Sequence, residues 1–419
     1  MSSSPSVLRV LILCTKYSLN SDSPYLTDEL AEAISRAGHD VDVIYVDWAG
    51  AENKSGRAAT TRGPVVNIVP ALILNRGPLR WRQVIKWVIS PVRACWTAWR
   101  IDRLFAADVV VCFSPLTALA LPVFLLTRDT DRRRFMVQWD FFPDSHFDDG
   151  VLNGNLKRRF LRWLESSLMR RFTAIGCMSP RNIEYMRSNC DLRGQVKEHL
   201  LPLWSSMPRY VARPRDIIRR DFDLPNYQPV FVFGGQLISG RGIEDILEAA
   251  IMAKRDGAEF TLIFIGKGPK ASDIQAKCAL TAIDVRVLDS LPRNQYLELL
   301  SACDVGLVTT LNVDVPTFPS KTLDYLQTGT MILASVDAST DYGTFIEQTR
   351  VGVQVPAGNP AALTKAIKSL CRCMPISEEM RMQKRDHSLR ILREYFSADI
   401  AAKIVLGTLD KPNWLPVLE

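Results

Sequence analysis

The sequence is poor in the residues from which metal centres and disulfide frameworks are built. Its four histidines are scattered, and its nine cysteines include no Cys-x-x-Cys pair. Cys371 and Cys373 are neighbours, but they lack partners at the spacing of a zinc site. An odd number of cysteines without a framework is typical of a reducing compartment. We therefore expect no metal ion and no other cofactor.

Long apolar runs are also missing. The opening stretch, MSSSPSVLRVLILC, holds an apolar run of about six residues and no small-residue cleavage pattern, so it does not read as a secretory signal. The longest apolar run, ALALPVFLL (118–126), is too short to span a bilayer and contains Pro122. The sequence predicts a cytoplasmic protein that does not cross the membrane.

What the chain does contain is a globular composition, with 47% hydrophobic and 23% charged residues. A length of 419 residues favours two domains over one. The formal net charge of +7 favours an anionic partner, whether nucleotide, phosphorylated lipid, membrane surface or nucleic acid.

Apolar strand-like runs alternate with segments of helical period in both halves of the chain. The runs lie at 7–14, 41–46, 65–71, 108–114, 134–142 and 173–179, and again at 229–235, 260–266, 285–290, 304–310, 330–336 and 351–356. This alternation is typical of parallel sheets covered by helices. We expect an α/β protein with two Rossmann-like, doubly wound domains, over residues 1–205 and 206–395, and a tail over 396–419 that can pack back on the first domain. Such sheets bind ligands at the carboxyl ends of their strands, which for two facing domains means the cleft between them.

Three glycine-rich or helix-starting stretches in the second half suggest phosphate binding. In GGQLISGRGIEDILEA (234–249), glycines end a strand and Arg241 precedes a helix whose N-terminus attracts anions. An ordinary strand–helix loop with a solvated arginine explains the stretch equally well. In FIGKGPKASDI (264–274), Gly266, Lys267 and Gly268 could cradle a nucleotide, or simply form a turn before Pro269.

The third stretch is PTFPSKTLDYLQTGTMILAS (316–335), in which a helix starts near Ser320 and stops at Gly329. Lys321 places a cation at the positive end of that helix, where acids are favoured. A diphosphate bound to the capped helix end would resolve the conflict, with the N–H groups of Lys321 and Thr322 pointing outward and Asp324 accepting from a ribose hydroxyl. The alternative is that Lys321 bends into solvent at a cost of about a few tenths of a kcal/mol.

These stretches, taken in order, resemble the donor domain of family-4 retaining glycosyltransferases with the GT-B fold. The similarity covers about residues 229–370 and includes LPRNQYLELLSACDVGLV (291–308). The first half is less similar, through LRVLILC, ELAEAISRAGHDVDVI and MSPRNIEYM. WDFFPDSH (139–146) resembles a variant in bacterial enzymes that build surface polysaccharides such as exopolysaccharide and O-antigen.

The resemblance implies specific site residues. Contacts with the donor diphosphate fall on Gly235, Arg241, Ser320, Lys321 and Thr322, and contacts with the nucleoside on Gly266, Lys267, Gly268 and Asp324. Arg241 and Lys321 would stabilise the leaving group during sugar transfer, in place of a metal. On the acceptor side, Asp140, Asp144 and His146 are candidates to orient the acceptor hydroxyl or take its proton, with Asp140 and His146 counted as catalytic. A polar loop that caps a strand is the alternative for these three.

The sequence departs from the family pattern at three places. The usual Arg-x4-Lys pair falls on Gln236 and Arg241, the Glu-x7-Glu pair on Pro316 and Asp324, and the His-Asp pair on Trp139-Asp140. The resemblance implies transfer of a sugar, with retention, from a nucleotide-diphosphate donor to a lipid-linked bacterial saccharide. The departures keep two alternatives open: a non-catalytic GT-B subunit that binds nucleotide and scaffolds a complex, and a sugar-nucleotide epimerase.

A basic, tryptophan-rich stretch stands out in the first half. Residues 77–105 hold six cations against the single acid Asp102, with four interleaved tryptophans, and LKRRFLRWLESSLMRRF (156–172) has a similar character. Such segments suit the headgroup region of an anionic membrane. We therefore expect peripheral association with the inner face of the cytoplasmic membrane, although ordinary packing helices would also account for the pattern. Nothing matches a nucleic-acid-binding module.

Overall fold

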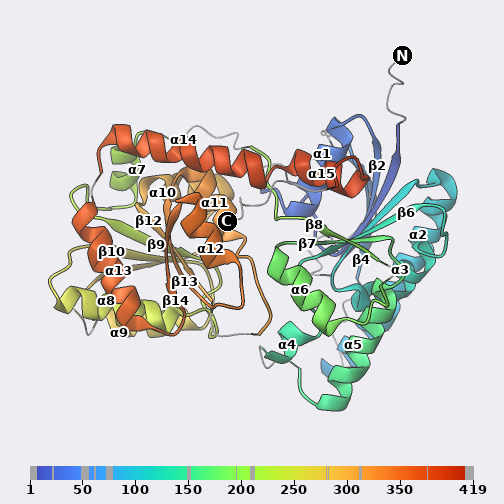
Figure 1. The fold of residues 1–419 in the computed structure, drawn as a ribbon, viewed down its shortest axis with the longest axis horizontal. Helices are drawn as coiled ribbons and strands as arrows, with labels where there is room; N and C mark the ends of the chain where they lie inside the picture. The colour runs from blue at the N-terminus through green and yellow to red at the C-terminus, as the bar shows by residue number, and fades with distance from the viewer. Residues whose placement is uncertain are drawn as a thin grey trace. The chain divides into compact units, whose positions relative to one another are not determined.

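The structure is a computed structural model that describes residues 7–20, 23–48, 56–60, 63–71, 79–148, 152–194, 196–207, 213–279, 281, 283–310, 314–374 and 376–410. The chain forms two compact units (Figure 1). The first comprises residues up to Ser206 together with a C-terminal segment from Ser397, and the second comprises the residues from Met207 to Phe396. Each unit is described here by itself.

The first unit is built on an eight-stranded sheet with the order β3-β4-β2-β1-β5-β6-β7-β8. All neighbours are parallel except β3 and β4. The strands are β1 (Arg9–Cys14), β2 (Asp40–Asp47), β3 (Gly56–Ala59), β4 (Val65–Pro70), β5 (Val109–Phe113), β6 (Arg133–Gln138), β7 (Ala174–Cys177) and β8 (Lys197–Leu200). The continuous apolar runs of β1 and β5 are buried along nearly their whole length, as in a sheet covered on both faces.

Helices cover both faces of this sheet. They are α1 (Leu26–Arg36), α2 (Leu79–Phe105), the 3-10 helix η1 (Leu116–Leu119), α3 (Ala120–Leu126), α4 (Asp144–Asp148), α5 (Asn155–Met169), α6 (Pro180–Asn189) and α15 (Ala398–Leu406). The C-terminal helix α15 packs against α1, as Figure 1 shows, and shares the apolar core of the first sheet through residues such as Ile404 and Val405. The helix α15 therefore belongs to the apolar core of the first unit.

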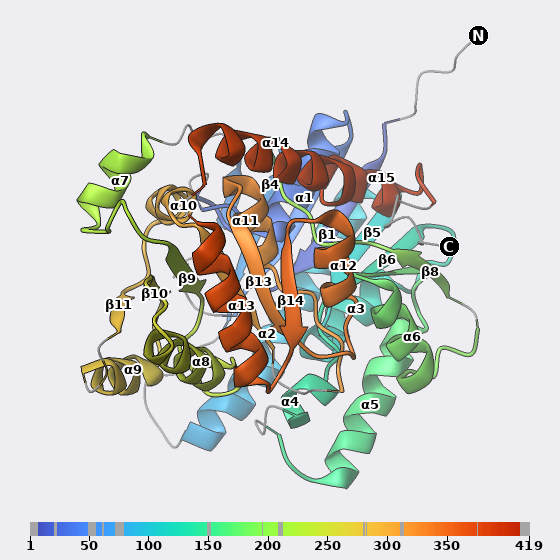
Figure 2. The same cartoon turned by 60° about the vertical axis from the view of Figure 1, so that its left-hand side comes forward.

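The second unit contains a six-stranded, wholly parallel sheet with the order β11-β10-β9-β12-β13-β14. Its strands are β9 (Val230–Gly234), β10 (Thr261–Ile265), β11 (Asp284–Leu288), β12 (Val305–Thr309), β13 (Met331–Val336) and β14 (Gly352–Pro356). Its helices are α7 (Arg215–Asp221), α8 (Ile243–Arg255), α9 (Lys270–Ala279), α10 (Arg293–Ala302), α11 (Lys321–Thr328), α12 (Tyr342–Thr349), α13 (Pro360–Cys373) and α14 (Glu378–Tyr395). Figures 1 and 2 show α8 and α13 side by side, and both contribute to one core beneath the sheet.

These two doubly wound units confirm the predicted fold class. One local difference affects the candidate site. The apolar run 134–142 predicts a strand to its end, but β6 stops at Gln138. The backbone N–H groups of Trp139 and Asp140 donate to the Ser114 hydroxyl at 3.0 and 3.1 Å instead of joining a strand ladder. Asp140 therefore stands in the loop just past the end of β6.

Candidate functional site

The second sheet reverses its winding direction between β9 and β12. The chain lays down β9 first, adds β10 and β11 on one side, and then places β12, β13 and β14 on the other. Doubly wound sheets bind ligands outside the carboxyl ends of their strands at such a switch point. The loop after β9 carries Gly235 and Arg241, and the segment after β12 leads into Lys321, so the predicted phosphate contacts lie beside this point.

A pocket of about 610 Å³ opens at the carboxyl ends of β9, β10 and β11. It brings together four residues predicted from the sequence, Gly235, Gly266, Lys267 and Gly268. The residues that complete its lining are Gln236, Ile238, Ile265, Ser290, Leu291 and Tyr296.

The glycines of this pocket are required by contact between two loops. A Cβ on Gly266 would lie 1.8 Å from the carbonyl oxygen of Gly235, and one on Gly268 would lie 2.1 Å from that of Leu237. The two N–H groups of Gly235 and Gly266 already donate to Ile265 and Leu288. Gly266 and Gly268 therefore allow the two loops to approach closely. The N–H groups of Gly235 and Gly266 extend the hydrogen bonding of the sheet into the loops.

Lys321 begins α11 and turns inward, so the solvent-facing alternative is wrong. Its ammonium lies 3.9 Å from the centre of the Phe233 ring, and a Cβ on Gly235 would lie 3.7 Å from Nζ. The charge is thus held at the end of β9, partly over an aromatic face. Burial and the positive charge of Arg241, opposed by the negative charge of Asp324, together lower the pKa of Lys321 to about 7.

The charge of Arg241 reaches Lys321, although neither side chain lines the pocket of about 610 Å³. The Arg241 side chain is exposed, and its backbone carbonyl accepts a hydrogen bond from the Thr309 hydroxyl at the end of β12. Gly242, which follows it, has a left-handed φ of 64° and stands at the N-cap of α8. In the described part of the chain, no carboxylate forms an ion pair with either cation. Two cations at one sheet edge without a paired acid form a place for an anion.

The start of α11 differs from its prediction. The Ser320 side chain forms no capping hydrogen bond, and Ser320 already has a helical backbone. The N–H of Thr322 donates to the Pro319 carbonyl at 3.2 Å, so it does not point outward. The Thr322 side chain is buried, and its hydroxyl is hydrogen-bonded to Pro319 and to the Tyr342 hydroxyl, each at 2.7 Å. The Thr322 side chain therefore joins the start of α11 to Pro319 and to α12, and it does not point toward a ligand site.

Asp324, one turn into α11, is held by an arginine that sequence reasoning missed. Nη2 of Arg293, at the start of α10, donates to Oδ1 of Asp324 at 2.5 Å. A signal was present, because Arg293 places a cation at a helix N-terminus in the same unusual way as Lys321. Tyr296 was also missed. Its hydroxyl packs against Gly234, where a Cβ would lie only 2.2 Å from the hydroxyl oxygen, and burial raises the pKa of this hydroxyl.

In the first unit, the structure separates the three acceptor-side candidates by environment. Asp140 is exposed at the end of β6, and His146 is half-buried in α4, with Nδ1 3.3 Å from the Ser145 hydroxyl. Asp144 is buried, and it accepts from Nε of Arg158 at 2.8 Å and Nε of Arg162 at 2.7 Å. The carboxylate of Asp144 thus ties α4 to α5, whereas Asp140 and His146 keep their side chains accessible.

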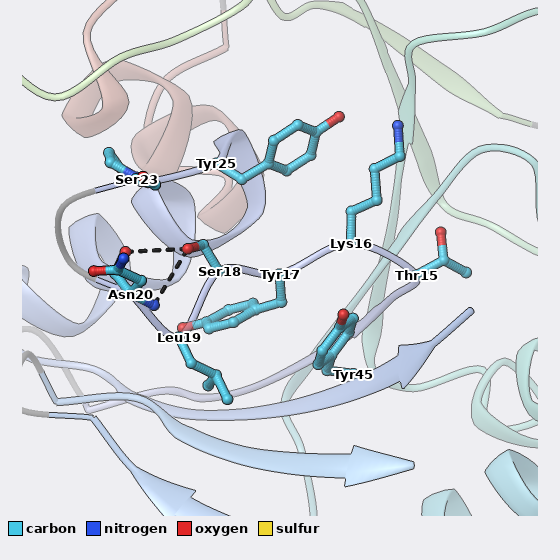
Figure 3. Close-up of a pocket in the computed structure, with 10 residues that line it drawn as sticks. Thr15, Lys16, Tyr17, Ser18, Leu19, Asn20, Ser23, Tyr25 and Tyr45 are labelled. Carbon is cyan, nitrogen blue, oxygen red and sulfur yellow. Dashed lines mark hydrogen bonds between the residues drawn. The ribbon is translucent and has the colours of Figure 1, made fainter. Parts of the chain in front are cut away.

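A second pocket, of about 620 Å³, lies at the carboxyl end of β1 (Figure 3). It is formed by the loop from Thr15 to Asn20, the segment before α1, and Tyr45. In Figure 3, Lys16 extends to one side of the loop, and the rings of Tyr17 and Tyr45 lie on the other. Tyr25 contacts Trp139, the neighbour of Asp140, with ring centroids 6.2 Å apart. Sequence reasoning missed this pocket because its residues are common loop residues without a motif.

The described residues contain no group of three or more histidine, cysteine or acidic side chains arranged to hold a metal ion. The expectation that no metal takes part therefore stays a prediction. None of the helices within the described ranges has the length and apolarity needed to cross a bilayer.

Comparisons with known proteins agree with this fold. The family model "Glycosyl transferases group 1" matches residues 228–373, and "Glycosyl transferase 4-like domain" matches residues 25–204. A probable glycosyltransferase, WbjE of Pseudomonas aeruginosa, is 31% identical over 288 residues, which cover 64% of this chain and 68% of WbjE.

Solved structures share the fold at low sequence identity. Sucrose-phosphate synthase from Thermosynechococcus elongatus is similar with a TM-score of 0.71 and 15% identity, over 96% of this chain and 98% of its own. HepE from Anabaena, in complex with UDP-glucose, has a TM-score of 0.64 and 14% identity, over 96% and 99% of the two chains. The architecture is that of a GT-B glycosyltransferase. The chain belongs to the group 1 glycosyltransferases with the family-4 type of N-terminal domain, and it is a transferase enzyme.

Proposed function

We propose that the protein transfers a sugar from a nucleoside-diphosphate donor to a lipid-linked saccharide during bacterial surface-polysaccharide synthesis, with retention of configuration and without a metal. The observation that carries the donor assignment is the pair of cations at the switch point of the second sheet. The charge of Arg241 reaches Lys321, and no described carboxylate forms an ion pair with either side chain. The complex of HepE with UDP-glucose is further support, because that protein shares the fold.

The cation pair suits the chemistry of sugar transfer. Cleavage of the sugar–phosphate bond leaves negative charge on the departing nucleoside diphosphate. Fixed cations in a partly buried site stabilise that charge in the transition state, without needing a metal ion. Because the pKa of Lys321 is lowered to about 7, binding of a diphosphate would favour the protonated form of its side chain. Retention of configuration is proposed from family resemblance, and no residue of this chain is assigned to it.

The acceptor is proposed to bind to the first unit, at the carboxyl edge of its sheet. Asp140, His146 and the pocket around Lys16 and Tyr25 offer a carboxylate, an imidazole and hydrogen-bonding groups at that edge. Asp140 is the better candidate to accept a proton from the acceptor hydroxyl, because its carboxylate is exposed and Asp144 is occupied by two arginines.

An exposed face of aromatic and basic side chains supports a membrane-bound acceptor. It is formed by α2, α3 and α5, which contact one another in sequence. Its exposed apolar residues include Trp96, Trp99, Leu121, Phe124, Leu156, Phe160 and Trp163. We call this the aromatic–basic face.

Cations accompany the rings of this face. Arg100 lies over Trp96, Arg103 over Trp99 and Arg171 over Phe124, at 5.4, 5.3 and 4.1 Å. Exposed rings next to arginines are characteristic of the interface of an anionic bilayer. Residues 77 and 78 and the side chains of Arg80, Trp81, Arg82 and Trp87, also part of the predicted membrane segment, lie outside the described residues. We propose that the enzyme works at the inner face of the cytoplasmic membrane.

Release of UDP from UDP-sugars tests the donor assignment. Purified enzyme with a lipid-extract acceptor should release nucleoside diphosphate, and Arg241→Ala and Lys321→Ala should each lower turnover roughly 10- to 100-fold, as expected for lost charge-assisted hydrogen bonds. Lys277→Ala, on the exposed side of α9, is the matched control. Unchanged turnover in both site variants would refute the phosphate assignment. Release of nucleotide without any acceptor would favour an epimerase instead.

A further inference from the structure

The second unit has another basic pocket, at the opposite edge of the sheet from the candidate donor site. Its volume is about 350 Å³, and it lies where β12 and β13 begin, next to Asp304 and Met331. Five cations line it, namely Arg213, Arg215, Arg381, Lys384 and Arg385, against two carboxylates, Asp304 and Glu378. The amino ends of the strands are not where the family site lies, so this pocket is not part of the donor site.

The central carboxylate of the pocket is already saturated. Oδ1 of Asp304 accepts from Arg215 at 2.7 Å and from Arg381 at 2.8 Å. Oδ2 accepts from the fully buried Arg219 at 2.6 Å and from the N–H of Val230 at 2.9 Å. Three guanidinium groups thus share one negative charge. Burial, together with the like charges of Arg219 and Arg381, lowers the pKa of Arg215 to about 10 despite its contact with Asp304.

Further positive charge comes from α14. Lys384 and Arg385 both line the pocket and are partly buried. Within the described ranges, neither forms an ion pair with a carboxylate. Glu378 does little to balance them, because it is largely exposed and 3.9 Å from Arg381. Arg213 is engaged outside the pocket by Glu298 and Asp221. Partly buried cations in excess of acids raise the energy of the folded state unless an anion joins them.

We propose that this pocket binds a small phosphate-bearing anion, such as a phosphomonoester, at a site distinct from the donor site. Guanidinium groups match phosphate oxygens in pairs, and several of them around one recess favour a multiply charged tetrahedral group over a single carboxylate. A volume of about 350 Å³ lies within the range of small-ligand sites.

The pocket contacts the helix that carries Lys321. Thr328 and Gly329, at the C-terminal end of α11, line it. Gly329 has a left-handed φ of 73°, and a Cβ there would lie 2.7 Å from Cα and Cβ of Arg385. Figures 1 and 2 show α14 alongside α11. An eight-residue helix spans about 12 Å, so Lys321 and an anion bound in this pocket would lie at opposite ends of α11.

Inorganic phosphate is the probe for the test. The melting temperature of the full-length protein is measured in sodium phosphate and in sodium chloride of equal ionic strength. We expect phosphate to raise it in the wild type, because a ligand that binds only the native state stabilises it by mass action. The variant Lys384→Gln/Arg385→Gln should lose that increment. Arg390→Gln, an exposed arginine on the same helix, and Arg241→Gln, at the donor site, should keep it.

Each other outcome decides against the pocket. Equal melting temperatures in the two salts would overturn the proposal, as would a phosphate increment that survives in the double variant. Loss of the increment in Arg241→Gln instead would place the phosphate at the donor site. If the double variant does not fold, Lys384→Gln alone is titrated with phosphate by calorimetry in the presence of saturating UDP, where wild-type protein should still bind and the variant should bind at least several-fold more weakly.

Discussion

Nη2 of Arg293 lies 2.5 Å from Oδ1 of Asp324, which joins the first turns of α10 and α11. Asp324 is the carboxylate that the family resemblance assigns to the donor ribose. A carboxylate has lone pairs for more than one donor, so the arginine fixes its orientation and leaves acceptor capacity for a hydroxyl group. Arg293 is therefore a positioning residue for the proposed nucleoside site.

We expect Arg293→Gln to weaken UDP binding roughly 5- to 30-fold, which corresponds to about 1–2 kcal/mol for one lost charge-assisted contact. Calorimetric titration with UDP measures it. Asp324→Asn in the same background should add little, since the two residues act as one unit. Additive losses in the double variant would show that Arg293 acts independently of Asp324.

Lys321 is expected to reduce the stability of the unliganded protein. Its pKa falls from 10.5 in an unfolded chain to about 7 in the folded protein. Between these values the unfolded chain binds more protons, so the contribution of Lys321 to stability rises with pH from 7 to 10.5 and is least favourable at or below pH 7. Lys321→Met keeps the apolar stem over Phe233 and removes the charge. It should raise the melting temperature at pH 7 while lowering sugar transfer.

The gain should shrink as the pH is raised toward 10, which melting curves over that range would show. Lys267→Met, an exposed lysine of the neighbouring loop, is the control and should leave the melting temperature nearly unchanged. A Lys321→Met protein that melts below wild type at pH 7 would contradict the assignment of Lys321 as a partly buried cation that destabilises the unliganded fold.

Nucleotide affinity should depend on pH through the same group. A bound diphosphate favours protonated Lys321, so the affinity for UDP should decline as pH rises above 7, by at most about tenfold per pH unit. Ionisation of UDP changes little over this range, because a phosphate with a second pKa of about 6 is already about nine-tenths ionised at pH 7. Titrations between pH 7 and 9 would detect the slope, and Lys321→Met should give a flat profile. An identical slope in that variant would assign the titration to another group.

The aromatic–basic face should bind vesicles that contain anionic lipid. Replacing Trp96, Trp99 and Trp163 with serine should reduce sedimentation with phosphatidylglycerol vesicles several-fold and leave nucleotide binding intact, since buried aromatic area and headgroup charge both contribute to binding. Tyr227→Ser, which removes an even more exposed aromatic residue from the second unit, is the control. Undiminished sedimentation of the triple variant would remove the basis for placing the enzyme on the membrane.

Asp144 is expected to matter for stability rather than for turnover. Asp144→Asn leaves Arg158 and Arg162 without their shared carboxylate and should cost about 1–3 kcal/mol of folding free energy. Chemical denaturation measures that loss. At a temperature where both proteins are folded, sugar transfer by the variant should stay within a few-fold of wild type, whereas Asp140→Asn should abolish most of it with little loss of stability. The reverse pattern would exchange the roles of the two aspartates.

The sequence by itself determined most of the two sheets, because most of their strands are apolar runs that alternate with segments of helical period. It did not predict β3 or β8. It also placed the glycines around 235 and 266 at strand ends, and Arg241 and Lys321 at helix starts. Ile243, Ile246 and Leu247 form the buried face of α8 that their spacing predicts.

Only the tertiary structure decided which side chains serve the site and which serve the fold. Thr322 and Asp144 have the chemistry of ligand contacts, yet the Thr322 hydroxyl is hydrogen-bonded to Pro319 and Tyr342, and Asp144 is taken up by two arginines. The pairing of Arg293 with Asp324, 31 residues apart, depends on how two helices pack. Local sequence patterns predict the type of a helix or strand and the chemistry of its residues. Whether a polar side chain is paired with another residue or remains free to bind a ligand depends on contacts between segments that are distant in the sequence.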